Sequence, residues 1–229
     1  MVKVNDFLKN RQFMFFLILA VLIILTAVFA PIITGGVDPL EGSMENALQA
    51  PCKEHIFGTD KMGRDIFTRV IYGARASLVS TFGVVLLIFL IGTAVGVIAG
   101  CFGGIVDAAL MRIADMMVAF PGLVLALAVA GIIGSSMKNA IIAITLVSWT
   151  KYARLARSLV LKIKDRDYVS AAIVAGSRRG HIIRAYMLPN ALPILIITAA
   201  TDVGSMMLEL AALSFLGFGA KPPTPEWGY

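Results

Sequence analysis

Uncharged apolar runs recur along the chain at a length that suits membrane-spanning helices. The runs over 13–33 and 76–102 contain no charged residue. A helix needs about 20 mostly apolar residues to cross the hydrocarbon core of a bilayer, because each residue adds about 1.5 Å. Three further stretches, 113–134, 139–160 and 190–216, are long enough but contain charged side chains. The pattern predicts an all-α integral membrane protein with five transmembrane helices.

Composition and charge support this class and orient the chain. Hydrophobic residues make up 59% of the sequence and charged residues only 15%, whereas soluble domains carry about 25%. The segment from Lys151 to Arg184 holds nine Lys/Arg and two Asp, a local net charge of +7 that accounts for the whole net charge of +6. Basic residues beside spans mark the cytoplasmic side. We therefore expect a cytoplasmic segment here and no nucleic-acid partner.

The alternation of spans then sets the expected domain organisation. Residues 1–12 form a cytoplasmic N-terminus, 13–33 the first transmembrane helix, which is retained rather than cleaved, and 34–73 an external segment. Residues 74–229 form the core, with a cytoplasmic loop at about 165–189. The basic residues of the N-terminus favour the same orientation: Lys3, Lys9 and Arg11.

The stretch "YVSAAIVAGSRRGHIIRAYMLPN", residues 168–190, interrupts the apolar pattern. Its first half predicts a helix with one smooth face, which Gly176 ends. Its second half predicts a helix that is apolar on one side and basic on the other, and Pro189 and Pro193 are expected to interrupt the chain before the last span. The smooth face comprises Tyr168, Ala171, Ala172 and Ala175; the apolar arc, Ile182, Ile183, Tyr186 and Met187; and the basic arc, Arg178, His181 and Arg184. By residue pattern alone, a protein-docking element and a helix lying on anionic headgroups remain equal alternatives.

This stretch resembles the cytoplasmic EAA loop of binding-protein-dependent ABC importer permeases. The family pattern is Glu-Ala-Ala, three residues, Gly, nine residues, Ile-x-Leu-Pro. Ser170 and Tyr186 depart from it. The resemblance implies that the loop forms a coupling helix seated in a groove of an ATPase subunit. The residues that match the pattern are Ala171, Ala172, Gly176, Leu188 and Pro189, and we expect Tyr168, Arg178 and Arg179 to contribute to the same contact.

Two other stretches resemble the oligopeptide/dipeptide/nickel branch of this family. They are "HIFGTDKMGRDIFTRVIYGARASL" (55–78) and "LSFLGFGAKPPTPEWG" (213–228), while "TDVGSMMLELAALSFLG" (201–217) is more similar to the nickel-permease subfamily. The resemblance implies a type I ABC importer permease fold in the cytoplasmic (inner) membrane of a prokaryote. It also implies a sixth span and a cytoplasmic tail beyond Tyr229, so we expect this chain to represent part of a longer protein.

The resemblance also implies a set of partners. We expect a second homologous permease subunit, two ATPase subunits that hold ATP and Mg, an extracytoplasmic substrate-binding protein and membrane lipid. This chain itself is expected to bind no cofactor, and no metal ligand is assigned.

Acidic residues inside the last apolar stretch are candidates for the translocation path, because charged groups within a bilayer are unfavourable and mark function. Asp202 and Glu209 are seven residues apart and share a helix face with Met206. An acidic stripe would attract a cation. Alternatively, Asp202 pairs with a partner subunit, or with Arg112 or Asp115, in a structural network.

Three basic residues recur at intervals of three within 139–160. Lys151, Arg154 and Arg157 are expected to anchor the helix by reaching to the inner membrane surface.

No enzyme class is indicated. The sequence has two histidines and lacks HExxH, GxSxG and a phosphate-binding GxxxxGK[ST] loop. ATP hydrolysis is therefore expected on separate subunits.

We expect the chain to be a permease subunit that imports nickel as a chelate, with dipeptide or oligopeptide import by the same mechanism as the alternative. A non-transporting structural membrane subunit or a channel is the alternative from another class.

Overall fold

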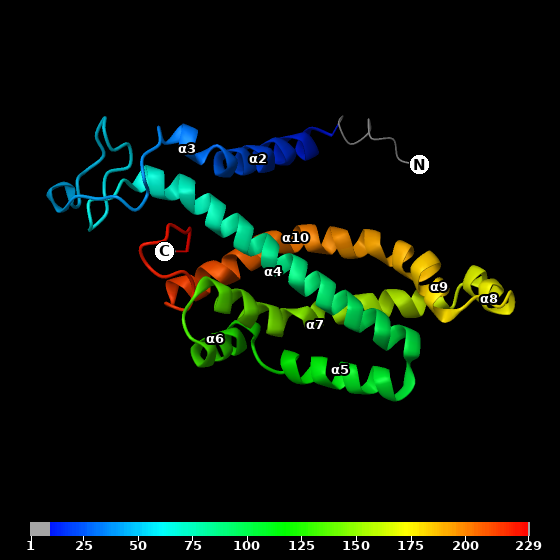
Figure 1. Ribbon diagram of the computed structural model, residues 1–229. Helices are drawn as coiled ribbons and strands as arrows, with labels where there is room; N and C mark the ends of the chain where they lie inside the picture. The colour runs from blue at the N-terminus through cyan, green and yellow to red at the C-terminus, as the bar shows by residue number, and fades with distance from the viewer. Residues whose placement is uncertain (1–9, 229) are drawn as a thin grey trace. The chain divides into compact units, whose positions relative to one another are not determined.

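The computed structural model describes residues 10–228, which form a succession of helices (Figure 1). Within this range the only strand-like feature is an isolated bridge between Thr59 and Asp65. The helices are α2 (Arg11–Val28), α3 (Ala30–Ile33), η1 (Met44–Asn46), α4 (Ile66–Phe102), α5 (Gly104–Val118), α6 (Gly122–Ile133), α7 (Met137–Lys164), α8 (Asp167–Val174), α9 (Arg179–Ile182), the π-helical η2 (Ile183–Met187) and α10 (Leu188–Phe215). The chain forms two compact units, residues 1–79 with 221–229 and residues 80–220.

Fewer helices than expected qualify as spans by length and composition. Among the described residues these are α2, α4 and the continuous run Arg179–Phe215, and a fourth if α5 and α6, which meet at 91°, count as one bent span. The single span predicted over 113–134 is therefore wrong as a straight helix. Pro121 stands at the N-cap of α6, and proline disfavours helical geometry in the residue before it. The predicted helix over 139–160 is present within α7.

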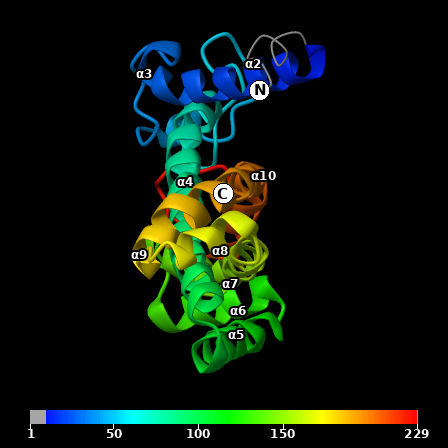
Figure 2. The same ribbon diagram turned by 90° about the vertical axis from the view of Figure 1, so that its right-hand side faces the viewer.

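The unit of residues 80–220 is built around α7. Tyr152, Ala153, Ala156 and Val160 of this helix are completely buried, and α5, α6 and α10 all pack on it. Figures 1 and 2 show α8 and α9 at one end of α7 and α10. The helix α7 therefore connects the α8–α9 loop with the interior of this unit.

Three glycines allow α4 to approach α7 closely. A Cβ added to Gly96 would lie 2.7 Å from Ala156 Cβ and 2.9 Å from Arg157 N, and added Cβ atoms on Gly92 and Gly100 would meet α7 as closely. Because the glycines recur every four residues, they lie on one helix face. Small residues at this spacing let two membrane helices gain van der Waals contact along their length.

The other unit brings the chain end beside the first turns of α4. The Trp227 indole donates to the Val70 carbonyl at 2.9 Å, and the Trp227 backbone N–H donates to Ser77 Oγ at 3.1 Å. Arg69 donates to the Pro223 carbonyl at 3.0 Å. Residues 221–228 therefore pack against the part of α4 that follows the segment 34–65.

Candidate functional site

The basic interruption forms two short helices joined at Gly176. The Ser177 N–H donates to the Ala172 carbonyl and the Gly176 N–H to the Ile173 carbonyl, both at 3.0 Å. These two bonds form a Schellman motif, which requires a left-handed residue after the helix. Gly176 has φ +79° and supplies that conformation. The predicted end of the first helix at Gly176 is confirmed.

Only part of the predicted smooth face of α8 is accessible. Ala172 is buried against the rest of the chain, together with Val169. Tyr168, Ala171 and Ala175 are exposed, and so is Val174, with 89% of its surface accessible. Among the described residues, the face of α8 available to another protein therefore runs along Tyr168, Ala171 and Val174–Ala175.

The second half of the loop continues without interruption into α10. The helical run from Arg179 to Phe215 is unbroken, so the predicted interruption at Pro189 and Pro193 is wrong. Pro189 comes two residues after the π-helical turn η2, and Pro193 lies inside α10. A local π-helical turn shifts the backbone hydrogen bonds of a helix without ending it. The predicted arcs are confirmed: Ile182 and Met187 are buried and Ile183 and Tyr186 half-buried, while Arg178, His181 and Arg184 are exposed. Of the other residues expected in the coupling contact, Arg179 is exposed and Leu188 is half-buried.

An aromatic contact ties the two halves of the loop together. The rings of Tyr168 in α8 and Tyr186 in η2 have centroids 5.9 Å apart, and His181 meets Tyr186 edge-on at 6.2 Å. Tyr186, which replaces the isoleucine of the family pattern, thus contacts an aromatic ring within the same loop.

Asp202 lies in α10 and is only 4% exposed. Its carboxylate accepts hydrogen bonds from Lys151 Nζ at 2.6 Å and from the Tyr152 hydroxyl at 2.9 Å. Both partners belong to α7, so the buried charge is paired and hydrogen-bonded across the α7–α10 contact. Neither Arg112 nor Asp115, which the sequence offered as partners, bonds to Asp202 in the structure.

A cavity of about 510 Å³ with charged side chains in its lining opens beside this cluster. Asp202, Met206 and Glu209 all line it, together with Lys151. Glu209 is partly buried, and no ion pair within residues 10–228 includes it. The cavity therefore presents one ammonium and two carboxylates. Its remaining lining residues are Ile88, Met117, Val118, Phe120, Gly122, Val147, Ser148, Thr150 and Ser205.

Three basic residues of α7, Lys151, Arg154 and Arg157, pair with acids of this chain. Arg154 contacts Asp115 at 2.7 Å and Arg157 contacts Asp107 at 2.6 Å, both across to α5. Because Lys151 forms an ion pair with Asp202, all three cations have a carboxylate partner. The spacing on α7 alone did not reveal these ion pairs, and the role of the three residues as anchors at the inner membrane surface stays a prediction.

Outside the apolar helices, the carboxylates of Asp60 and Asp65 stabilise the segment before α4 through hydrogen bonds. Asp60 accepts from Arg64 Nε at 2.8 Å and from the Met62 N–H at 2.8 Å. Burial alone would raise the pKa of Asp60, but these hydrogen bonds outweigh it and hold that pKa below its ordinary value. Asp65 caps α4 through the Thr68 N–H at 2.7 Å.

A cavity of about 500 Å³ lies in the same unit, between this segment and the chain end. It is lined by charged and aromatic side chains of both, among them Lys61, Arg69 and Trp227. Residues 60–70 and the chain end therefore form one surface in this unit.

Residues 10–228 contain no cluster of three or more His, Cys, Asp or Glu side chains that could hold a metal ion.

Comparison with known proteins gives two family matches. Residues 92–229 match the family described as binding-protein-dependent transport system inner membrane component. Residues 4–51 match the N-terminal transmembrane domain of oligopeptide transport permease C.

Individual relatives fall in both the peptide and the nickel branches. The dipeptide transport system permease protein DppC of Alkalihalophilus pseudofirmus is 44% identical over 220 residues, 96% of this chain and 72% of that protein. The nickel transport system permease protein NikC of Escherichia coli is 40% identical over 191 residues, 83% of this chain and 69% of that protein. The relatives therefore do not separate a nickel from a peptide substrate.

One solved structure has the same fold. A chain of the MetNI methionine ABC transporter, in inward facing conformations, superimposes with a TM-score of 0.59 at 23% identity. The match covers 68% of this chain and 77% of that chain.

Proposed function

Because the chain belongs to the family of inner membrane components of binding-protein-dependent transport systems, we propose that it is the permease subunit through which a short peptide crosses the cytoplasmic membrane in an ATP-driven ABC importer. The mixed charge of the cavity beside Asp202 is the observation that favours a peptide as the substrate. ATP hydrolysis, with its Mg, would take place on two separate ATPase subunits. A second homologous permease would complete the path.

The loop over 167–187 is proposed to couple ATP hydrolysis to transport. The exposed face of α8 offers small and apolar side chains that an ATPase groove could cover. The helix that follows is continuous from Arg179 to Phe215, and Asp202 lies about 35 Å along it at about 1.5 Å per residue. A displacement of the loop would therefore move Asp202 and Glu209 with it.

The cavity supports a zwitterionic substrate. A short peptide carries an ammonium at one end and a carboxylate at the other. Glu209 could receive the ammonium, and Lys151 could exchange its bond to Asp202 for the substrate carboxylate. Charged hydrogen bonds of this kind are stronger than neutral ones. The same cavity could receive a nickel chelate, which the 40% identity to NikC favours as the second candidate.

The orientation follows from the same proposal. The basic loop and the N-terminus (1–12) would face the cytoplasm, with 13–33 as the first span. Residues 34–73 and 221–228 would face outward and receive an extracytoplasmic binding protein that delivers the substrate. The cavity lined by Lys61, Arg69 and Trp227 lies on that surface and could accept a protruding side chain.

Uptake by the complete transporter tests the substrate. The chain, its partner permease, the ATPases and the binding protein are reconstituted in vesicles with ATP, and a labelled dipeptide is competed against a nickel–histidine chelate. We expect ATP-dependent dipeptide uptake that excess unlabelled dipeptide suppresses and the chelate does not. Nickel uptake that dipeptide fails to suppress would instead assign the chain to nickel transport, and no ATP-dependent uptake of either would contradict a transport role.

A further inference from the structure

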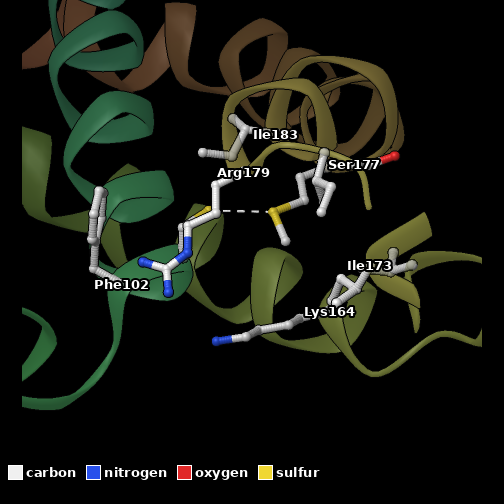
Figure 3. Close-up of a pocket in the computed structure, with 10 residues that line it drawn as sticks. Phe102, Lys164, Ile173, Ser177, Arg179 and Ile183 are labelled. Carbon is white, nitrogen blue, oxygen red and sulfur yellow. Dashed lines mark hydrogen bonds between the residues drawn. The ribbon is translucent and has the colours of Figure 1, made fainter. Parts of the chain in front are cut away.

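A second cavity lies at the base of the loop, where the ends of α4 and α7 meet the α8–α9 segment. Its volume is about 450 Å³. Phe102, Ile173 and Ile183 provide part of its apolar wall, and Lys164, Arg179 and Ser177 provide its polar side chains (Figure 3). The cavity therefore combines an apolar wall with two cations from different helices.

Neither cation forms an ion pair within the described chain. The ion pairs formed within residues 10–228 include Lys151, Arg154 and Arg157 but neither Lys164 nor Arg179. In Figure 3 the charged ends of both side chains lie on the side of the cavity where the Phe102 ring stands. Two like charges that share a cavity repel each other. An anion between them would remove that repulsion and gain charged hydrogen bonds.

The surroundings indicate what kind of anion fits. Phe102 is 59% exposed and Ile105, at the start of α5, is 89% exposed. Lys164 ends α7 and Phe102 ends α4. In the orientation proposed above, on which this step rests, both helix ends reach the inner surface of the membrane, where anionic headgroups lie. A free phosphate would leave the adjacent apolar surface uncovered, whereas an acyl chain would cover it.

We propose that this cavity binds the headgroup of an anionic phospholipid, with Lys164 and Arg179 contacting the phosphate and Phe102 contacting an acyl chain. The planar guanidinium of Arg179 suits two parallel hydrogen bonds to phosphate oxygens, and Lys164 supplies a point charge. Ser177 can donate a further hydrogen bond. Because the two cations come from α7 and α9, the bound lipid links the end of α7 to the loop that precedes α10.

Lipid retention by the purified complex tests this site. Complexes of the chain with its partner subunits are purified in detergent from membranes that contain phosphatidylglycerol and phosphatidylethanolamine, and retained lipids are quantified by mass spectrometry. The variant is Lys164→Gln with Arg179→Gln. The control is Lys162→Gln with Arg166→Gln, which removes the same charge from exposed neighbours that do not line the cavity. A parallel wash with inorganic phosphate distinguishes a lipid site from a free-anion site.

The wild type is expected to retain phosphatidylglycerol above its share of the membrane. The cavity variant should retain roughly 25-fold less, because each of the two removed cations contributes about fivefold to anionic lipid binding near the surface, and the control should match the wild type. Absence of enrichment in the wild type, an equal loss in the control, or release of the lipid by inorganic phosphate would each overturn the proposal. Lipid retention does not depend on transport, so a complex that imports nothing but keeps the lipid leaves this inference intact.

Discussion

Complexes that carry Lys151→Gln together with Asp202→Asn are expected to fold and yet to import substrate roughly tenfold or more slowly than the wild type, since a lost charged hydrogen bond to a substrate has about this effect. Lys151→Gln alone leaves the buried Asp202 carboxylate with only the Tyr152 hydroxyl. We expect that single change to lower the free energy of unfolding by about 1–3 kcal/mol, because a buried charge has lost its partner. The double change removes both charges and should recover most of that loss.

The two measurements separate a structural role from a transport role. Thermal unfolding in detergent measures how much stability the double variant recovers, and uptake into vesicles measures transport. The pair Arg157→Gln with Asp107→Asn is the control, because it removes another partly buried ion pair of α7 whose members do not line the cavity. Normal uptake by the Lys151/Asp202 double variant would show that this ion pair only holds α7 to α10.

Gly96→Ala is expected to destabilise the protein by about 1–3 kcal/mol, the usual effect of adding a methylene group to a packed interior. The added methyl would lie 2.7 Å from Ala156 Cβ and would also meet the Ala153 carbonyl. These neighbours are backbone or lie close to it, so α4 and α7 would have to separate. Thermal unfolding of the purified complex measures the change.

Gly83→Ala provides the matched control for this packing. Gly83 lies in the same helix, and an added Cβ would meet nothing within 4 Å in this chain. Alanine has a higher helix propensity than glycine, by up to about 1 kcal/mol, so the midpoint of unfolding should stay the same or rise. Equal destabilisation by both changes would contradict close packing of α4 on α7.

The sequence predicts the parts of the site that depend on local rules. Gly176 ends α8 because the Schellman motif needs a left-handed residue, and glycine adopts that conformation without strain. The arcs of the second half of the loop follow from helical periodicity alone. Conversely, the prediction at Pro189 and Pro193 is wrong, because the helix continues past both prolines by way of the π-helical turn η2.

The cluster of Asp202, Lys151 and Tyr152 could not be predicted in the same way. These residues are about fifty positions apart, and only the packing of α10 on α7 joins them. The sequence identified Asp202 as an intramembrane acid but gave no means to choose its partner. The spacing of Gly92, Gly96 and Gly100 does signal a close helix contact, although it does not say that α7 is the other helix.

Site-specific crosslinking tests most directly whether the loop at 167–187 docks on an ATPase subunit. A photoreactive phenylalanine derivative is placed at Val174, which is 89% exposed in the loop, or at Ile132, which is 87% exposed near the end of α6. After illumination of membranes that contain the whole complex, we predict a covalent product with the ATPase subunit from position 174 and none from position 132. The absence of that product at 174, or its equal formation from 132, would contradict the proposed coupling.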